Sequence, residues 1–275
     1  MIASFKYLDK STPIHRLDPR TKIVLLLSAT ITAASLRDLR ALLVLLALAV
    51  AYYALAQLPW RATRTAWRFF LFFIVVVVGI NTLIAGAGTN QVNDVVLVRL
   101  PLGISIGWSN VIQAFAIMCR MLIGAFMAIP ITFTIPPTRF GVAFRGLGLS
   151  DRIAFAVDLA IRLVPTYAAD FRSTIDAQRA RGFEVDKVRG GLLSRVRRLA
   201  PLAVPVTMNA IMSGEDITNA LDMRGFGLKP RTWLNRQPLK LVDWILIGVG
   251  FALVMAGIVW SAVVGRQLWV PPFPF

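Results

Sequence analysis

The run Phe69-Phe70-Leu71-Phe72-Phe73-Ile74-Val75-Val76-Val77-Val78 decides the fold class, because none of its side chains is charged or forms hydrogen bonds. The uncharged stretch around it extends over residues 69–87. A helix rises about 1.5 Å per residue and needs about 20 mostly apolar residues to cross the hydrocarbon core of a bilayer. Residues 69–87 therefore predict a transmembrane helix.

Four further segments predict spans of the same kind. Residues 111–129 are apolar except for Arg120, and residues 244–264 are uncharged, with Trp244 and Trp260 where interfacial aromatic residues usually lie. Residues 23–36 and 42–58 are shorter, and their ends are less sharply defined. We therefore expect an all-α, polytopic membrane protein with about five transmembrane helices.

The composition excludes several classes of protein. With one His and one Cys in 275 residues, the chain cannot supply a zinc site or a disulfide, because each needs several such ligands. The formal net charge of +16 could indicate nucleic acid, but long apolar runs separate the basic clusters, as in a bilayer protein. We expect the lipid bilayer as a partner, with no bound metal and no nucleic acid.

The Lys and Arg residues are strongly asymmetric between alternate loops. Five precede the first predicted span, three lie in residues 59–68 and seventeen in residues 130–240, whereas the opposite loops and tail hold four. Cytoplasmic loops carry the excess of these residues. The N-terminus is therefore predicted to be cytoplasmic and the tail at residues 271–275 to be outside. Residues 1–22 contain no apolar segment of the kind that a cleavable signal peptide has.

The predicted spans and the charge asymmetry divide the chain into three parts. Residues 1–129 hold four N-terminal spans, residues 130–240 form cytoplasmic helices, and residues 241–275 hold the last span and the tail. In the middle part, apolar residues recur three and four apart from Val164 to Ile175, which predicts an amphipathic helix ending near Gly182. The sequence Ser213-Gly214-Glu215-Asp216 has the spacing of a helix N-cap and predicts another helix, ending near Gly225.

Two of these helices are predicted to end alike, in Ala180-Arg181-Gly182 and in Met223-Arg224-Gly225. A glycine just past a helix adopts the left-handed conformation at little cost, so the preceding arginine projects from a rigid tip. A guanidinium is a donor fork suited to a carboxylate on a partner. Alternatively, each arginine only complements the negative end of its own helix, which is worth about 0.3–1 kcal/mol.

Four motifs along the chain match those of a known family. They are His15-Arg16-Leu17-Asp18-Pro19-Arg20-Thr21-Lys22, Ile161-Arg162-Leu163-Val164-Pro165, Asp176-Ala177-Gln178-Arg179-Ala180-Arg181-Gly182 and Met223-Arg224-Gly225-Phe226. With these motifs the chain resembles the transmembrane (T) component of the energy-coupling factor (ECF) transporters, the EcfT/CbiQ/BioN family. These transporters are vitamin and metal importers of the prokaryotic inner (cytoplasmic) membrane.

The resemblance implies a role and a set of partners. In that family, two Ala-Arg-Gly signatures end cytoplasmic coupling helices, and each docks in a groove of one ABC ATPase subunit. The T component connects the two ATPases to a substrate-binding membrane subunit, the S component, which topples in the membrane to release its vitamin or ion. It is a non-catalytic subunit without a cofactor, because ATP and Mg²⁺ belong to the ATPases. Here Met223 replaces the Ala of the second signature. The sequence leaves open whether the two ATPases are identical or different, and the unequal tips fit a heterodimer slightly better.

Two alternatives remain open. The permease of an ordinary ABC importer would carry the substrate path itself and usually a single coupling loop. A membrane-embedded enzyme would need acidic metal-binding clusters, but the only adjacent acidic pair, Glu215-Asp216, is better explained by the predicted helix start. The chain contains no G-x-x-x-x-G-K-[ST] sequence that would hold nucleotide phosphates. Arg120, inside a span, is either a functional residue or a structural partner of another polar group.

Overall fold

The computed structural model describes residues 12–88, 96–99, 105–182, 192–228 and 239–263. The protein is an all-α polytopic membrane protein that divides into two compact units. We call them the membrane unit, Lys6–Leu149 with Pro238–Phe275, and the two-helix unit, Ser150–Gln237. The boundary at Ser150 means that residues 130–149, which we expected in the cytoplasmic region, belong to the membrane unit.

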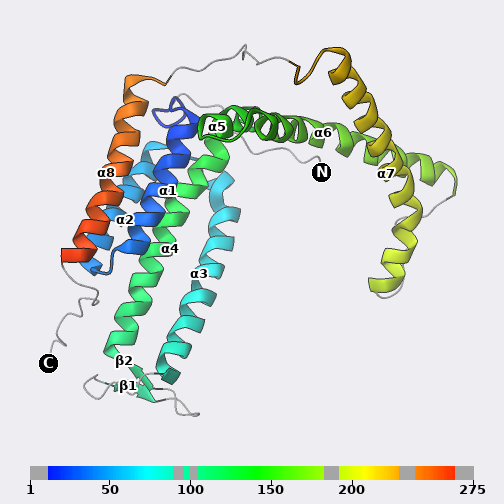
Figure 1. The fold of residues 1–275 in the computed structure, drawn as a ribbon. Helices are drawn as coiled ribbons and strands as arrows, with labels where there is room; N and C mark the ends of the chain where they lie inside the picture. Colours follow the sequence, from blue (N-terminus) through cyan, green and yellow to red (C-terminus); the bar gives the residue numbers. More distant parts are fainter. Residues whose placement is uncertain (1–11, 89–95, 100–104, 183–191, 229–238, 264–275) are drawn as a thin grey trace. The chain divides into compact units, whose positions relative to one another are not determined.

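The elements follow in chain order (Figure 1). The membrane unit contains α1 (Pro19–Ser35), α2 (Leu39–Leu55), α3 (Trp60–Gly88), β1 (Val96–Arg99), β2 (Ser105–Gly107), α4 (Trp108–Thr134), the 3-10 helix η1 (Pro137–Arg139), α5 (Phe140–Gly146) and α8 (Leu241–Val263). The two-helix unit contains α6 (Asp151–Ala180) and α7 (Leu192–Met223).

Each of the five predicted spans is a helix, and three of them have the length of a full span. Helices α3, α4 and α8 are long and apolar enough to cross a bilayer. Helices α1 and α2 have 17 residues each, which gives a rise of about 25 Å and lies at the lower limit for a spanning helix. The expectation that the first two spans are the shortest is therefore confirmed.

Helix α4 organises the core of the membrane unit, because α1, α2 and α3 all pack against it. Small alanines let backbones approach closely, and larger side chains fill the spaces between them. The main cluster of buried residues is Ala29, Ala33, Leu36, Leu42, Leu45, Ala49, Ala116, Ile123 and Met127. A second cluster joins α3 to the C-terminal half of α4 through Trp67, Ala125, Ile129 and Phe133. This end of α4 runs on through Pro130 to Thr134, past the predicted end at residue 129.

Arg120 is held by the end of α1. Its Nε donates to the carbonyl oxygen of Ala33 at 3.0 Å, and its Nη2 donates to that of Leu36 at 2.9 Å. These carbonyls belong to the last turn and cap of α1, where helix carbonyls have no partner within the helix. The structure therefore supports a structural role for Arg120, since its guanidinium donates hydrogen bonds to free carbonyl oxygens at the C-terminus of α1.

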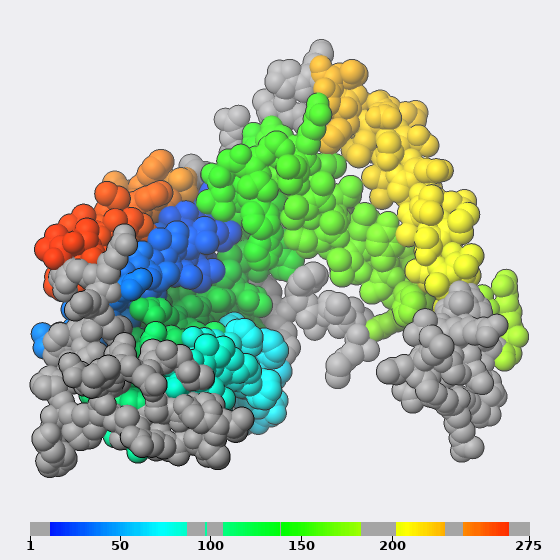
Figure 2. All heavy atoms as spheres, turned by 60° about the horizontal axis from the view of Figure 1, so that its bottom comes forward, coloured from blue at the N-terminus to red at the C-terminus, as the bar shows by residue number. Residues whose placement is uncertain are grey.

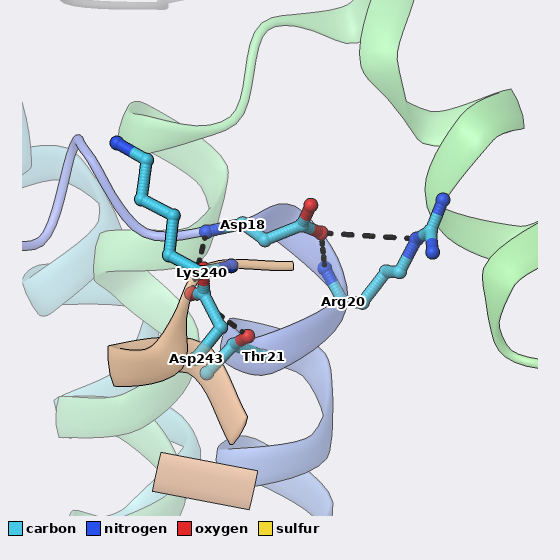
Figure 3. A network of polar contacts seen from close by, with 5 residues as sticks. All are labelled: Asp18, Arg20, Thr21, Lys240 and Asp243. Carbon is cyan, nitrogen blue, oxygen red and sulfur yellow. Dashed lines mark hydrogen bonds and ion pairs between the residues drawn. The ribbon is translucent and has the colours of Figure 1, made fainter. Parts of the chain in front are cut away.

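A buried carboxylate joins the starts of α1 and α8 (Figure 3). Asp243, 3% exposed, accepts hydrogen bonds from the Asp18 backbone N–H and the Thr21 hydroxyl, each at 3.1 Å, and from the Lys240 N–H at 3.1 Å. Asp18 in turn caps α1 by accepting from the Arg20 N–H at 2.9 Å. The motif that contains Asp18 and Thr21 therefore fixes the start of α1 to the start of α8.

Two local predictions differ from the structure. Ser213-Gly214-Glu215-Asp216 is not a helix start, because α7 runs unbroken through it for 32 residues. A glycine inside a helix costs only about 1 kcal/mol relative to alanine, which the long helix tolerates. The stretch Gly103-Ile104-Ser105-Ile106-Gly107, which the sequence predicts as a glycine-rich loop before Trp108, contains β2, which pairs with β1 in antiparallel register, Val98 opposite Ile106. The β-branched residues of 95–98 were the signal for this hairpin.

Candidate functional site

Helix α6 ends in the first predicted tip, Ala180-Arg181-Gly182. The backbone N–H of Arg181 donates to the carbonyls of Ala177 and Gln178 at 3.3 and 3.1 Å, and that of Gly182 donates to Arg179 at 2.9 Å. Gly182 has φ +85°, the left-handed conformation of a helix C-terminus. The three tip residues are exposed, so the Arg181 guanidinium lies at the surface of the two-helix unit.

Helix α7 ends in the second predicted tip, Met223-Arg224-Gly225. The Gly225 N–H donates to the Asp222 carbonyl at 2.9 Å, and the Phe226 N–H donates to the Leu221 carbonyl at 3.0 Å. These two bonds, with φ +69° at Gly225, make up a Schellman motif. In the first tip, the bond from the Gly182 N–H to the Arg179 carbonyl corresponds to the bond from the Gly225 N–H to the Asp222 carbonyl. The next residue, Phe183, lies outside the described residues. The two tips therefore share one backbone geometry.

The second tip carries an exposed arginine, Arg224, directly after Met223. Met223 is 90% exposed and Arg224 is also exposed, whereas Gly225 is partly buried. The space around Gly225 is limited by the Leu228 side chain, 3.5 Å from where a Cβ would be. Because it is 90% exposed, the side chain of Met223, which stands in place of alanine, projects outward from the described part of this unit.

Within the two-helix unit the tips are far apart. Helices α6 and α7 contact each other and cross in Figure 1. The ring of Phe226 packs on that of Phe155, in the first turns of α6, with centroids 4.7 Å apart. Phe155 and Ala180 are separated by 25 helical residues, which corresponds to a distance of about 38 Å. The six predicted residues therefore lie at two separate positions, one near each end of α6.

An apolar stripe on α7 is the third feature of this unit. Its members follow a spacing of three and four residues, which places them on one helix face, and each is at least 52% exposed. They are Val204, Met208, Ile211 and Met212. The sequence predicts an adaptable surface from Met208, Met212 and Met223, but it does not indicate Val204, Ile211 or the Phe155–Phe226 contact.

Similarity to known proteins agrees with this architecture. The family model CbiQ, described as a cobalt transport protein, matches residues 10–234. A protein named energy-coupling factor transporter transmembrane protein EcfT, from Limosilactobacillus fermentum, is 25% identical over 86% of this chain and 91% of its own length. The protein of the same name from Heliobacterium modesticaldum is 28% identical over 91% of each chain.

A third relative has a different name. It is a putative ABC transporter ATP-binding protein from Bifidobacterium longum, 28% identical over 80% of this chain. The match covers 28% of that protein's own length, so the region like this chain is one part of a longer polypeptide. The family model covers most of the chain, from the segment before α1 through both helix tips. The chain therefore belongs to the CbiQ family and is a transmembrane component of an energy-coupling factor transporter.

Proposed function

We propose that this chain is the coupling subunit of an ECF importer. It links ATP hydrolysis by two ABC ATPase subunits to the movement of a substrate-binding S component, for the uptake of a vitamin or a metal ion. The chain itself is non-catalytic, and ATP and Mg²⁺ are bound by the ATPases. The observation that carries this proposal is the pair of Arg-Gly helix tips with matching backbone geometry at two separate positions of one unit.

The geometry of the tips suits two ATPase subunits better than one. A left-handed glycine fixes the direction of the chain after each helix, so each arginine is presented from a defined end. About 38 Å separates the ends of α6 at which the tips lie, and this distance allows each tip its own partner surface. Each arginine would donate two hydrogen bonds to a carboxylate in a groove of its ATPase.

The relative from Bifidobacterium longum supports ATPase partners. That protein is named as an ATP-binding protein of an ABC transporter, and a region of it resembles this chain. Its polypeptide therefore combines a region of this type with ATP-binding parts, and we propose that the same parts associate here as separate subunits. A heterodimer of ATPases fits the unequal tips, since Ala180 is small and Met223 is long. A single ATPase species in the purified complex would contradict the heterodimer.

The stripe on α7 is the proposed contact for the S component. Val204, Met208, Ile211 and Met212 expose an apolar face on α7, which is not among the three helices apolar enough to cross a membrane in the described part of the chain. Exposed apolar faces of this kind indicate docking surfaces, and methionine adapts to partners of different shape. A sliding contact with an apolar membrane subunit requires an exposed apolar face and side chains that adapt their shape.

The orientation is proposed from charge. The two-helix unit and the segments before α1 and at the start of α3 hold most of the Lys and Arg residues, which places them in the cytoplasm, where ATP is available. The membrane is then the cytoplasmic membrane of a prokaryote, with the N-terminus inside. The tail at residues 271–275, which we expect outside, lies beyond the described residues.

Affinity purification from native membranes in mild detergent tests the proposal. The unaltered chain, the Arg181→Glu/Arg224→Glu variant and an Arg172→Glu control are purified side by side, and every co-purifying protein is identified. Arg172 is exposed in the middle of α6, so its replacement makes the same kind of charge change away from the tips. We expect ATPases and a small membrane subunit with the unaltered chain and the control, and loss of the ATPases from the double variant. An unaltered chain that purifies alone would contradict the coupling function.

A further inference from the structure

Three arginines line one face at the start of α3, namely Arg61, Arg64 and Arg68. Their spacing of three and four residues places the guanidinium groups along one side of the helix. All three are exposed, and none of their guanidinium groups has a hydrogen bond or an ion pair among the residues that the structure describes. The sequence explains part of this, because Asp94 is the only acidic residue between Asp38 and Asp151. The three positive charges therefore lack a countercharge on α3 and on α4.

The position of these arginines along α3 corresponds to the headgroup level of a bilayer. Residues 69–88 of the helix rise about 30 Å, which equals the thickness of the hydrocarbon core. The two turns that precede them then lie in the polar interface. Helix α3 packs mainly against α4, and Figure 2 shows part of its surface, in cyan, at the edge of the membrane unit. The arginine face is therefore open to lipid headgroups.

A groove between α3 and α4 begins beside this face. It has a volume of about 460 Å³, and its walls are small or apolar side chains with two threonines. They are Ala62, Thr65, Ala66, Phe69, Phe70, Ala128, Ile129, Thr132 and Phe133. Ala62 and Thr65 alternate with Arg61 and Arg64 along the first turns of α3, so the apolar groove and the cationic face adjoin. The small alanines leave room for the hollow, and the rings of Phe69, Phe70 and Phe133 contribute to its walls.

We propose that α3 and α4 form a binding site for an anionic phospholipid. The phosphate of the headgroup accepts hydrogen bonds from Arg61, Arg64 and Arg68, and one acyl chain lies in the groove. Basic pockets between transmembrane helices bind anionic headgroups in this way, and juxtamembrane arginines attract them. An amphiphile fits both parts of the site at once, whereas a protein helix in the groove would bring no charge for the arginines unless it carried acidic residues at the same level.

Native mass spectrometry of the full-length chain in detergent tests this site, with phosphatidylglycerol and phosphatidylcholine as the added lipids. An arginine near an anionic surface contributes roughly fivefold in affinity, so the Arg61→Gln/Arg64→Gln/Arg68→Gln variant should bind phosphatidylglycerol roughly a hundredfold more weakly. The control is Arg152→Gln/Arg162→Gln/Arg172→Gln, which removes three exposed arginines from α6. This control should keep the affinity of the unaltered chain.

A second variant tests the groove and leaves the arginines in place. Thr132 is exposed and lines the groove, so Thr132→Phe places a ring in the space proposed for the acyl chain without displacing a core residue. We expect weaker phosphatidylglycerol binding, with the melting temperature of the chain unchanged. Equal affinity for the two lipids, or full phosphatidylglycerol binding by either variant, would overturn the proposal. Loss of a membrane subunit from the purified complex while Thr132→Phe still binds lipid would assign the groove to a protein partner instead.

Discussion

Gly182 and Gly225 have the same left-handed backbone at the ends of two long helices, with φ +85° and +69°. An L-residue with a Cβ adopts this conformation at a cost of roughly 1–2 kcal/mol, because the Cβ comes too close to the following carbonyl oxygen. At Gly182 no heavy atom outside its neighbours lies within 4 Å of the position that a Cβ would take. The requirement for glycine at this tip is therefore a property of the backbone and not of packing.

A Gly182→Ala variant should consequently open the last turn of α6 more easily. We expect the free energy of local opening, measured by amide hydrogen exchange in that turn, to fall by about 1 kcal/mol. The matched control is Gly214→Ala, in the interior of α7, where a Cβ also meets nothing within 4 Å. That change should raise helix stability by about 0.5–1 kcal/mol, because alanine has the higher helix propensity. Similar effects from the two changes would contradict a special backbone at the tip.

Arg120 provides a second prediction that depends on a single side chain. Arg120→Leu removes the donors to the Ala33 and Leu36 carbonyls and leaves the C-terminus of α1 without these bonds. Hydrogen bonds from a charged donor are worth about 1.5–3 kcal/mol, so we expect the free energy of unfolding in detergent to fall by about that amount. Arg120→Lys should retain part of it. Unchanged stability together with loss of transport would instead show that Arg120 acts on substrate or a partner.

The contact between α1 and α8 depends on two glycines seven residues apart. A Cβ at Gly250 would lie 2.9 Å from the Ser28 Oγ, and one at Gly257 would lie 2.9 Å from the Thr32 Cγ2. Small residues at such positions let helices in a membrane approach closely. The network around Asp243 fixes the same pair of helices at their starts, so α8 is fixed to α1 at several levels.

Gly257→Val should therefore separate α8 from α1. Overpacking of this kind costs about 1–3 kcal/mol, which we expect as a lower free energy of unfolding in detergent. Gly248→Val is the matched control on the same helix, since a Cβ there meets nothing within 4 Å and the residue is exposed. If both variants lose the same stability, the cause is the loss of glycine itself and not the contact with Thr32.

The helices could largely be predicted from the sequence, but the limits of several of them could not. Apolar runs indicate spans because the bilayer requires them, and all five appear as helices. The helix ends at Gly182 and Gly225 were also predictable, because a glycine after an amphipathic stretch terminates a helix by a local mechanism. Ser213 misled the prediction, since cap residues also occur inside helices when the flanking turns pack well. The bonds of Arg120 depend on where α1 ends in space, which no local pattern contains.

At the scale of the whole chain, sequence reasoning identified two tips but not their separation. The six tip residues were predicted one by one from helix ends and from the family resemblance, whereas the distance of about 38 Å follows from the length of α6 and the Phe155–Phe226 contact. The hydrogen bond from the Asp18 backbone N–H to the Asp243 carboxylate joins residues 225 positions apart and was equally unpredictable. The membrane unit and the two-helix unit are compact bodies of their own. The proposed lipid site belongs to the first, and the proposed ATPase contacts belong to the second.

The most direct test of the coupling account is the number of ATPase copies bound per chain, measured by native mass spectrometry of the complex assembled with its ATPases. The unaltered chain and the Arg172→Glu control should carry two copies. Replacing an arginine in a buried charge pair costs about 2–5 kcal/mol, so Arg181→Glu or Arg224→Glu alone should weaken ATPase retention more than tenfold. The double variant should remain in the membrane with no ATPase bound. Two copies on the double variant would contradict the account, because the tips would then not be the docking sites.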